Sequence, residues 1–172
     1  EVEDYQRVQV RGVDAAAVPG GVGADLAHAL AELLENALAF SPPHEAVEVR
    51  GRRTPDGYVL AVADTGLGMT PEELAVANRR LAGEESFTVA PSRYLGHYVA
   101  GHLASRLGIR IELQPGAAGG LVARVDIPHS LLVEAPTVAE VLDTMPARPE
   151  PLPAAPEAPW SAADFDPVVP EP

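Results

Sequence analysis

The sequence contains no cysteine and no lysine, and these two absences exclude several classes of chemistry. Without cysteine the chain can form neither a disulfide nor a thiolate that binds a metal or attacks a substrate. Without lysine it has no Walker-type phosphate loop, which needs a lysine on the phosphates, and no Schiff-base nucleophile. All 12 basic residues are arginines, so any cation in a site must come from Arg, from His or from a bound metal.

Aromatic residues and long apolar runs are also scarce. Aromatic residues make up 5% of the 172 residues, so Ala, Val and Leu must build the core from a hydrophobic content of 47%. No apolar run approaches the roughly 20 residues that span a bilayer. The net charge of −13 argues against a general nucleic-acid-binding protein. The first residue is Glu rather than Met and no charged-then-apolar leader follows, so we expect a piece of a longer protein. The absence of cysteine fits a reducing compartment, and we expect a cytoplasmic location.

Proline and charge divide the chain into two parts. Residues 134–172 hold 10 of the 18 prolines and 8 of the 25 acidic residues, but only one of the 12 basic residues. Such a composition buries too little apolar area to offset the entropy lost on ordering. We expect a globular domain over residues 1–130 and an acidic, largely disordered tail over residues 131–172.

The first part alternates between strand and helix patterns. Period-two patterns and turn signals predict strands, and apolar residues at helical spacing predict helices. Thr70 and Glu73 form a capping box at the start of the second helix, and Gly108 ends the third. The strand over 58–63 is apolar on both faces, so it should be central and covered. This order predicts an α/β two-layer sandwich with helices on one face of a mixed, mostly antiparallel sheet. The predicted strands are 7–11, 46–53, 58–63, 109–113 and 121–128, and the predicted helices are 23–39, 70–81 and 93–108, with a loop over 83–92.

Glu32 and Asn36 lie one turn apart on the first predicted helix, opposite its apolar stripe. Exposed polar side chains are ordinary on a helix, so a solvated face explains this pair as well as a metal–nucleotide site does. The two interpretations stay open on this helix alone.

The segment "DTGLGM", residues 64–69, follows the apolar strand over 58–63. An Asp at the end of a covered strand is costly unless something pairs with it, so Asp64 is a candidate acceptor for an exocyclic amino group. Gly66 and Gly68 allow the main chain to approach a flat ligand closely. The alternative is a tight turn capped by Asp64. Further on, Gly96 opens a helix whose N–H groups could face phosphate oxygens, with Arg93 beside them.

These three features resemble the ATP-binding domain shared by gyrase, Hsp90, histidine kinases and MutL, called the GHKL or Bergerat fold. "AELLENALAF" resembles its N box, "VADTGLGM" its G1 box and "SRYLGHYVAGHLA" its G2 box. The resemblance covers about residues 5–128, with the loop over 83–92 in the ATP lid. Within the family the chain is most similar to the catalytic domain of large actinobacterial sensor histidine kinases of the nitrate/nitrite-sensor type.

The resemblance implies ATP and Mg²⁺ as cofactors and a role for each motif residue. Asn36 would bind Mg²⁺ through its amide oxygen, and Glu32 would be the catalytic residue that holds metal and water. Asp64 would accept a hydrogen bond from the adenine amino group. The remaining cofactor-binding residues would be Gly66, Gly68 and Met69 around the base, and Arg93 and Gly96 near the phosphates.

The sequence also departs from the family pattern. Ala39 stands where many histidine kinases have a basic residue, and Tyr94 replaces the first glycine of the G2 box. His97 and Tyr98 follow Gly96, where small or aliphatic residues are commoner. His97 fits a satisfied helix histidine better than a ligand. These changes predict weak binding of the phosphates.

The sequence is therefore compatible with three functions. The leading hypothesis is a histidine protein kinase domain that donates the γ-phosphoryl group of ATP to a histidine on a dimerisation hairpin outside this chain. His44, the one histidine followed by an acid, lies in a Pro-flanked loop and does not suit that acceptor. The alternatives are a degenerate nucleotide-binding scaffold and a serine kinase of the anti-sigma-factor type. The implied partners are the hairpin domain, a response regulator and, by similarity, small GTPases and roadblock-type proteins; the parent sensor can be membrane-anchored.

Overall fold

The computed structural model describes residues 4–84, 95–117 and 119–134. The chain divides into two units, Glu1–Ala135 and Pro136–Pro172, and every described residue belongs to the first unit. Most of the predicted acidic tail, most of the predicted lid loop, and Arg93 therefore lie outside the described residues. The folded part continues past residue 130, because Leu131 and Leu132 pack against the core and Val133 pairs with Ala17.

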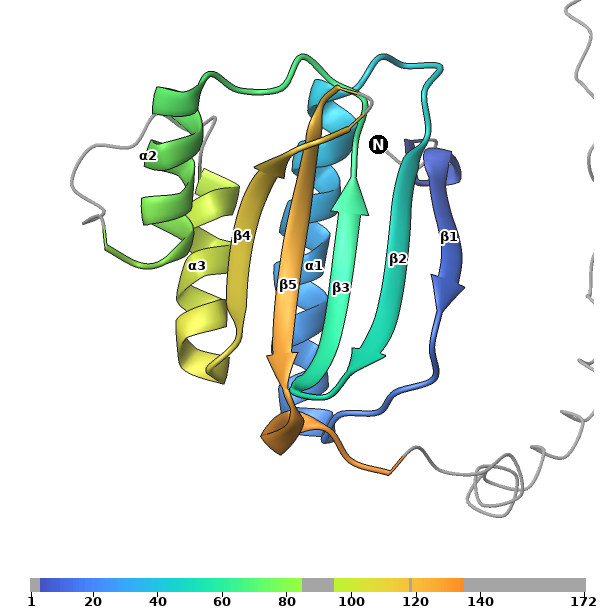
Figure 1. Ribbon diagram of the computed structural model, residues 1–172, viewed down its shortest axis with the longest axis vertical. Helices are drawn as coiled ribbons and strands as arrows, with labels where there is room; N and C mark the ends of the chain where they lie inside the picture. The colour runs from blue at the N-terminus through green and yellow to red at the C-terminus, as the bar shows by residue number, and fades with distance from the viewer. Residues whose placement is uncertain (1–3, 85–94, 118, 135–172) are drawn as a thin grey trace, which may run out of the picture. The chain divides into compact units, whose positions relative to one another are not determined.

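A five-stranded mixed sheet forms one layer of the described unit (Figure 1). Its order is β1-β2-β3-β5-β4, with β1 parallel to β2 and the other three pairs antiparallel. The prediction of a mixed, mostly antiparallel sheet is confirmed, and β3 is the central strand as predicted. The strands are β1 (Val8–Val13), β2 (Val47–Thr54), β3 (Gly57–Ala63), β4 (Arg110–Pro115) and β5 (Leu121–Pro128).

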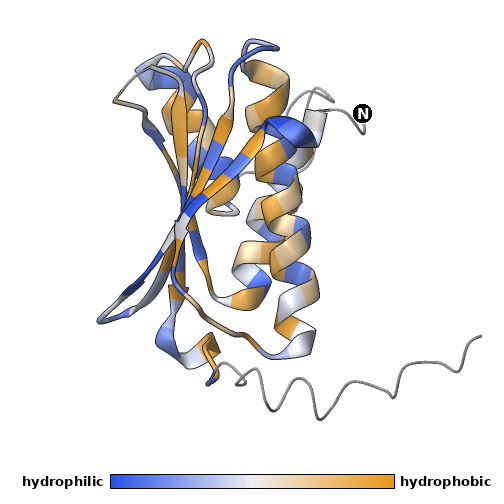
Figure 2. Cartoon of the chain, turned by 90° about the vertical axis from the view of Figure 1, so that its right-hand side faces the viewer, coloured by the Kyte–Doolittle hydropathy of each residue, from blue (hydrophilic) through white to orange (hydrophobic). Residues whose placement is uncertain are grey.

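Three α-helices form the other layer, all on the same face of the sheet (Figure 2). They are α1 (Gly20–Phe40), α2 (Pro71–Leu81) and α3 (Leu95–Leu107), and short 3-10 helices cover Asp4–Arg7 and His129–Leu131. This arrangement confirms the predicted two-layer α/β sandwich. None of the described helices combines the length and the apolar character that crossing a membrane requires.

Local sequence signals explain where the helices lie. The buried residues of α1 recur at helical spacing and face the sheet, and Pro42 and Pro43 follow its end. At the start of α2 the predicted capping box is present: Thr70 Oγ1 accepts from Glu73 N over 3.3 Å, and Glu73 Oε2 accepts from Thr70 N over 2.9 Å. Gly108 ends α3 with φ of +70°, as predicted.

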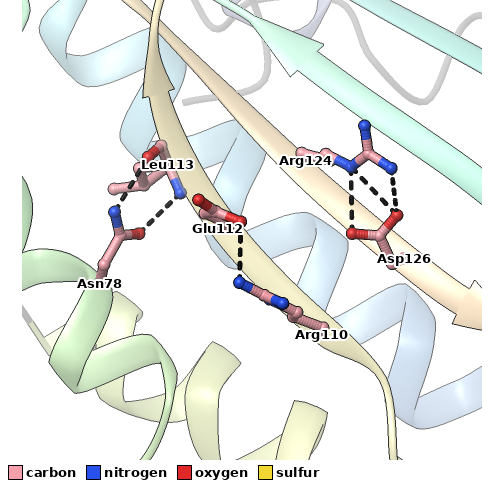
Figure 3. A network of polar contacts seen from close by, with 6 residues as sticks. All are labelled: Asn78, Arg110, Glu112, Leu113, Arg124 and Asp126. Atoms are coloured by element: carbon pink, nitrogen blue, oxygen red, sulfur yellow. Dashed lines mark hydrogen bonds and ion pairs between the residues drawn. The ribbon is translucent and has the colours of Figure 1, made fainter.

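The face of the sheet that carries no helix lies open in the described part of the chain (Figure 2). The prediction that β3 is covered is correct on its helix face only. On the open face, Val59 is 9% exposed although no second layer of described residues lies over it, and its cross-strand neighbours are Arg52 and Asp126. Ion pairs such as Arg124–Asp126, at 2.7 Å, lie on this face (Figure 3). On this face, charged side chains of the neighbouring strands flank the small residues of β3. The element expected to cover β3 on this side is not found among the described residues.

A single amide joins α2 to the edge strand β4. Asn78 Nδ2 donates to the carbonyl oxygen of Leu113 over 2.9 Å, and Asn78 Oδ1 accepts from Leu113 N over 2.7 Å (Figure 3). Both unpaired main-chain groups of an edge residue are satisfied in this way. The pair fixes the C-terminal half of α2 relative to the sheet.

Candidate functional site

A cavity of about 490 Å³ lies between the helices and the sheet. Residues of α1, α2 and the first turn of α3 form its walls, and residues of β3, β4 and β5 form its floor. Most lining side chains are apolar, for example Leu33, Val62 and Leu113. A concave, mostly apolar cavity with few polar groups is typical of a small-molecule site. The predicted site residues that line it are Asn36, Asp64, Gly68 and Met69.

Asp64 follows β3 and is held by two main-chain donors. Its Oδ1 accepts from Gly66 N over 2.8 Å and from Leu121 N over 3.3 Å. Burial raises the pKa of the Asp64 carboxyl, and the hydrogen bonds from Gly66 and Leu121 partly oppose this by lowering it. Both hydrogen bonds from described residues go to Oδ1. Oδ2 is therefore the oxygen that can accept from a donor on a ligand.

Three glycines close the main chain around Asp64. A Cβ at Gly66 would lie 3.0 Å from Asp64 Oδ1 and against the carbonyl oxygen of Phe40. Gly68 has φ of +71° and Gly120 has φ of +67°, and a Cβ at Gly120 would overlap the main chain of Asp64. The absence of side chains here lets a ligand reach the acidic residue across bare main chain.

Glu32 and Asn36 of α1 meet Gly96 of α3. A Cβ at Gly96 would lie 2.8 Å from both Asn36 Nδ2 and Glu32 Oε2, so a side chain at this position would displace both polar groups. Glu32 Oε1 also lies 3.4 Å from Nε2 of the exposed His28. The structure therefore brings the start of α3 onto the polar pair of α1.

The orientation of Asn36 suits a hard cation. Its Nδ2 donates to the carbonyl oxygen of Glu32 over 2.8 Å, which leaves Oδ1 as the atom available to a ligand. The described residues contain no group of three or more His, Asp or Glu that could hold a metal ion. An ion beside Asn36 would take its remaining ligands from a bound anion and from water, as Mg²⁺ commonly does. The residues present fit Mg²⁺ that arrives with an anionic ligand.

His97 lines the cavity next to Gly96, although the sequence predicted only a satisfied helix histidine. Its side chain is 4% exposed. Burial and, second, the positive charge of Arg80 lower the pKa of His97 to about 4, so the ring is neutral at pH 7. Arg80 lines the same cavity from α2. The sequence signal that could have indicated His97 is its place directly after Gly96.

Comparison with known proteins identifies the family. Residues 21–131 match the family described as histidine kinase-, DNA gyrase B-, and HSP90-like ATPase. The chain belongs to this ATPase family. The matched range begins in α1 and ends with the short helix His129–Leu131, so it includes every described element that contributes to the cavity.

Several solved structures are similar to this ATPase domain. The mycobacterial sensor histidine kinase MprB aligns with a TM-score of 0.59 and 22% identity, covering 73% of this chain and 85% of that chain. The ATP-binding domain of PrrB from Mycobacterium tuberculosis aligns with a TM-score of 0.55 and 20% identity, covering 70% and 78%. Full-length ShkA in complex with AMPPNP aligns with a TM-score of 0.56 and 18% identity, covering 74% and 27%. These likenesses show a common fold. A search of curated protein sequences found no match.

The predicted site residues of this ATPase domain fall into three groups. The first lines the cavity, as given above. The second lies at its edge: Gly66 donates to Asp64, and Glu32 and Gly96 contact Asn36. The third is Arg93, which lies outside the described residues. Ala39, which stands where many histidine kinases have a basic residue, is exposed at the end of α1. The roles of these residues remain predictions.

Proposed function

We propose that this chain is the Mg·ATP-binding catalytic domain of a sensor histidine kinase. It would donate the γ-phosphoryl group to a histidine on a dimerisation hairpin that is not part of this chain. The observation that carries the proposal is that one cavity is lined by both the partly buried Asp64 carboxylate and the Asn36 amide. One end can recognise a base, and the other can hold the metal that accompanies phosphates.

The chain's own groups can be assigned to parts of the nucleotide. Asp64 Oδ2 accepts from the exocyclic amino group of adenine, and Gly66, Gly68 and Met69 lie beside the base. Asn36 Oδ1 would be a ligand to Mg²⁺, and the ion would supply positive charge to the phosphate oxygens. Glu32 would help to hold metal and water, and Gly96 would present main-chain N–H groups of α3 to the phosphates, next to Arg93.

Two further observations support nucleotide binding. The match to the ATPase family spans both Asn36 and Asp64. In addition, ShkA, which has the same fold, was solved in complex with AMPPNP, a nucleotide. Binding of ATP by this chain is the simplest function that explains a largely apolar cavity lined by the Asp64 carboxylate and the Asn36 amide.

The proposed partners follow from the reaction. The acceptor is a helical hairpin that carries the phosphorylated histidine, and a response regulator takes the phosphoryl group from it. By similarity to related sensor kinases, small GTPases and roadblock-type proteins are further proposed partners. A kinase domain that uses ATP and passes a phosphoryl group to a response regulator works in the cytoplasm, and this holds if the parent sensor is anchored in a membrane. No nucleic acid takes part in the proposed reaction.

Titration calorimetry with ATP, with and without Mg²⁺, tests the proposal. We expect Mg²⁺ to strengthen the binding of ATP to the wild type. Asn36→Ala should lower the affinity for ATP in the presence of Mg²⁺ about tenfold and leave the affinity without Mg²⁺ unchanged. Glu35→Gln is the matched control, because Glu35 is the exposed neighbour of Asn36 on α1. No binding of ATP to the wild type at millimolar concentration would overturn the proposal.

A second assay tests the acceptor. Radiolabelled ATP, the wild-type chain and a histidine-bearing helical hairpin should give a labelled hairpin. Its label should be lost in acid and kept in alkali, as phosphohistidine requires. An acid-stable label would favour the serine kinase instead, and binding without any transfer would favour the degenerate scaffold.

A further inference from the structure

The last turn of α1 loses a main-chain donor to a proline. In a helix the carbonyl oxygen of one residue accepts from the N–H group four residues later. Ser41 N donates in this way to the carbonyl oxygen of Ala37 over 3.1 Å. For Leu38 the next donor would be residue 42, but Pro42 has no N–H group. The Leu38 carbonyl oxygen therefore needs a donor from outside the helix.

Arg7 supplies this donor from the end of the short helix that precedes β1. Its Nη1 donates to the carbonyl oxygen of Leu38 over 3.3 Å. Nη2 donates to the carbonyl oxygens of Pro42 over 2.7 Å and Ser41 over 3.4 Å, and Nε donates to that of Glu45 over 3.0 Å. One guanidinium thus binds the main chain of the last turn of α1 and of the segment that follows. Its positive charge also lies at the C-terminal end of the helix, where a cation is favourable.

The end of α1 depends on these hydrogen bonds because packing against the core holds the helix only up to Leu38. Ala37 and Leu38 are buried in the core, whereas Ala39 is exposed and Phe40 is 46% exposed. The last two residues of the helix are therefore fixed less by their own side chains than by the bonds that Arg7 makes on either side of them.

The last residue of α1 lies against the turn that carries Asp64. The Phe40 side chain lines the cavity, whereas Arg7 is not one of the lining residues. The carbonyl group of Phe40 packs on Gly66, where an added Cβ would overlap it. Gly66 N in turn donates to Asp64 Oδ1 over 2.8 Å. Arg7 is thus connected to the Asp64 carboxylate through Phe40 and Gly66.

We propose that Arg7 is a positioning residue for the base-recognition end of the cavity. It holds the end of α1 against Gly66, and this contact fixes the turn that presents Asp64 Oδ2 to the adenine amino group. This inference rests on the proposed function, since it concerns the same cavity. The Mg²⁺ end does not depend on Arg7, because Asn36 lies one turn before Phe40 in the part of α1 that the core fixes.

Titrations with Mg·ATP and with Mg·tripolyphosphate, which lacks the base, test the inference. In Arg7→Gln we expect the affinity for Mg·ATP to fall about tenfold and the affinity for Mg·tripolyphosphate to change less than about twofold. In Arg7→Lys, which keeps the charge but loses the planar fork of donors, the loss for Mg·ATP should be smaller. Arg11→Gln is the matched control, because the hydrogen bond and ion pair of Arg11 go to Gln9 and Glu48 rather than to α1.

The amide resonance of Gly66 gives a second measurement that needs no nucleotide. In a nitrogen–proton correlation spectrum we expect this resonance to shift in Arg7→Gln and to stay in place in Arg11→Gln, because only the first change reaches Phe40. A loss of stability that left the turn in place would not move it. A melting curve shows whether each variant folds, and Arg7→Lys carries both tests if Arg7→Gln does not fold.

The outcomes separate the two proposals. If the wild type binds no Mg·ATP, the proposed function fails, and the Gly66 resonance alone decides whether Arg7 positions the turn. If the wild type binds Mg·ATP and Arg7→Gln binds it equally well, the role of Arg7 is wrong and the proposed function stands. The role of Arg7 is also wrong if Arg7→Gln weakens Mg·tripolyphosphate as much as Mg·ATP, or if Arg11→Gln has the same effect.

Discussion

At the scale of the residue, Asp64 combines partial burial with one carboxylate oxygen left for a ligand. We expect Asp64→Asn to weaken both ATP and adenosine about tenfold or more, because an amide NH₂ would face the adenine amino group where an acceptor is needed. The two main-chain hydrogen bonds to Oδ1 can persist in the variant. Calorimetry with both ligands measures the loss. Asp126→Asn, on the open face of the sheet, is the control, and an Asp64→Asn variant that binds adenosine normally would contradict the assignment.

His97 is the second residue with a measurable consequence. Its pKa is about 4 in the folded protein and 6.5 ordinarily, so the unfolded chain binds a proton more readily between these values. Its contribution to stability is therefore complete above about pH 6.5 and is lost as the pH falls toward 4. Between pH 7 and pH 4 we expect the wild type to lose about 3 kcal/mol more unfolding free energy than His97→Gln.

Urea unfolding at a series of pH values checks this prediction for His97. His102→Gln is the control, because His102 is exposed on the same helix and should leave the acid loss of the wild type unchanged. Equal acid losses in the wild type and in His97→Gln would show that the ring is not held neutral by burial beside Arg80.

At the scale of the element, local chemistry made helices predictable and left pairing undetermined. The capping box at Thr70 and the glycine at 108 are short-range signals, so α2 and the end of α3 were predicted correctly. The parallel pairing of β1 with β2 was not, because no local residue pattern encodes which distant strand lies alongside. The open face of β3 was not predicted for a similar reason. A strand with apolar residues on both faces does not reveal what lies over each face, and long arginine side chains on neighbouring strands can cover apolar residues as a second layer does.

The contact between α2 and α3 gives an element-scale prediction. We expect Gly101→Ala to lower the unfolding free energy by about 1–3 kcal/mol, because its Cβ would press on the main chain of Arg80 and Leu81. Gly21→Ala, in the first turn of α1 with nothing within 4 Å, should instead be neutral or stabilise by up to about 1 kcal/mol. Chemical denaturation of both variants measures the difference. A neutral Gly101→Ala would mean that α3 can move away from α2 at little cost.

At the scale of the whole molecule, the sequence predicted the two ends of the site better than its walls. Asn36 and Asp64 were found because motifs mark them, and both line the cavity. Arg80 and His97 were not found as site residues, since their place depends on how α2 and α3 pack against each other. The packing of α2 against α3 depends on Gly101, and the amide of Asn78 fixes α2 against β4. Both are contacts between elements, and no pattern within one element encodes them.

The division of the chain gives the last prediction. A chain that ends at Ala135 loses residues 136–172, which carry seven acidic residues and one arginine. The described contacts of the first unit extend to Val133, whose N–H donates to Ala17 over 2.9 Å. We therefore expect the truncated chain to unfold cooperatively, with a melting temperature within about 4 °C of the full chain. A shorter chain that ends at Pro128 also loses Leu131 and Leu132 from the core and should be destabilised by about 2 kcal/mol or more.

The removed segment should still affect ATP through its charge. ATP is an anion, so loss of a strongly acidic segment should strengthen binding at low ionic strength. Because the Debye length shrinks to about 3 Å at 1 M salt, the difference between the two chains should vanish there. Calorimetry of both chains at low and high salt measures this effect. If the truncated chain bound ATP more weakly at every salt concentration, residues 136–172 would contribute to the site itself, and the assignment of a self-sufficient ATPase domain to the first unit would be wrong.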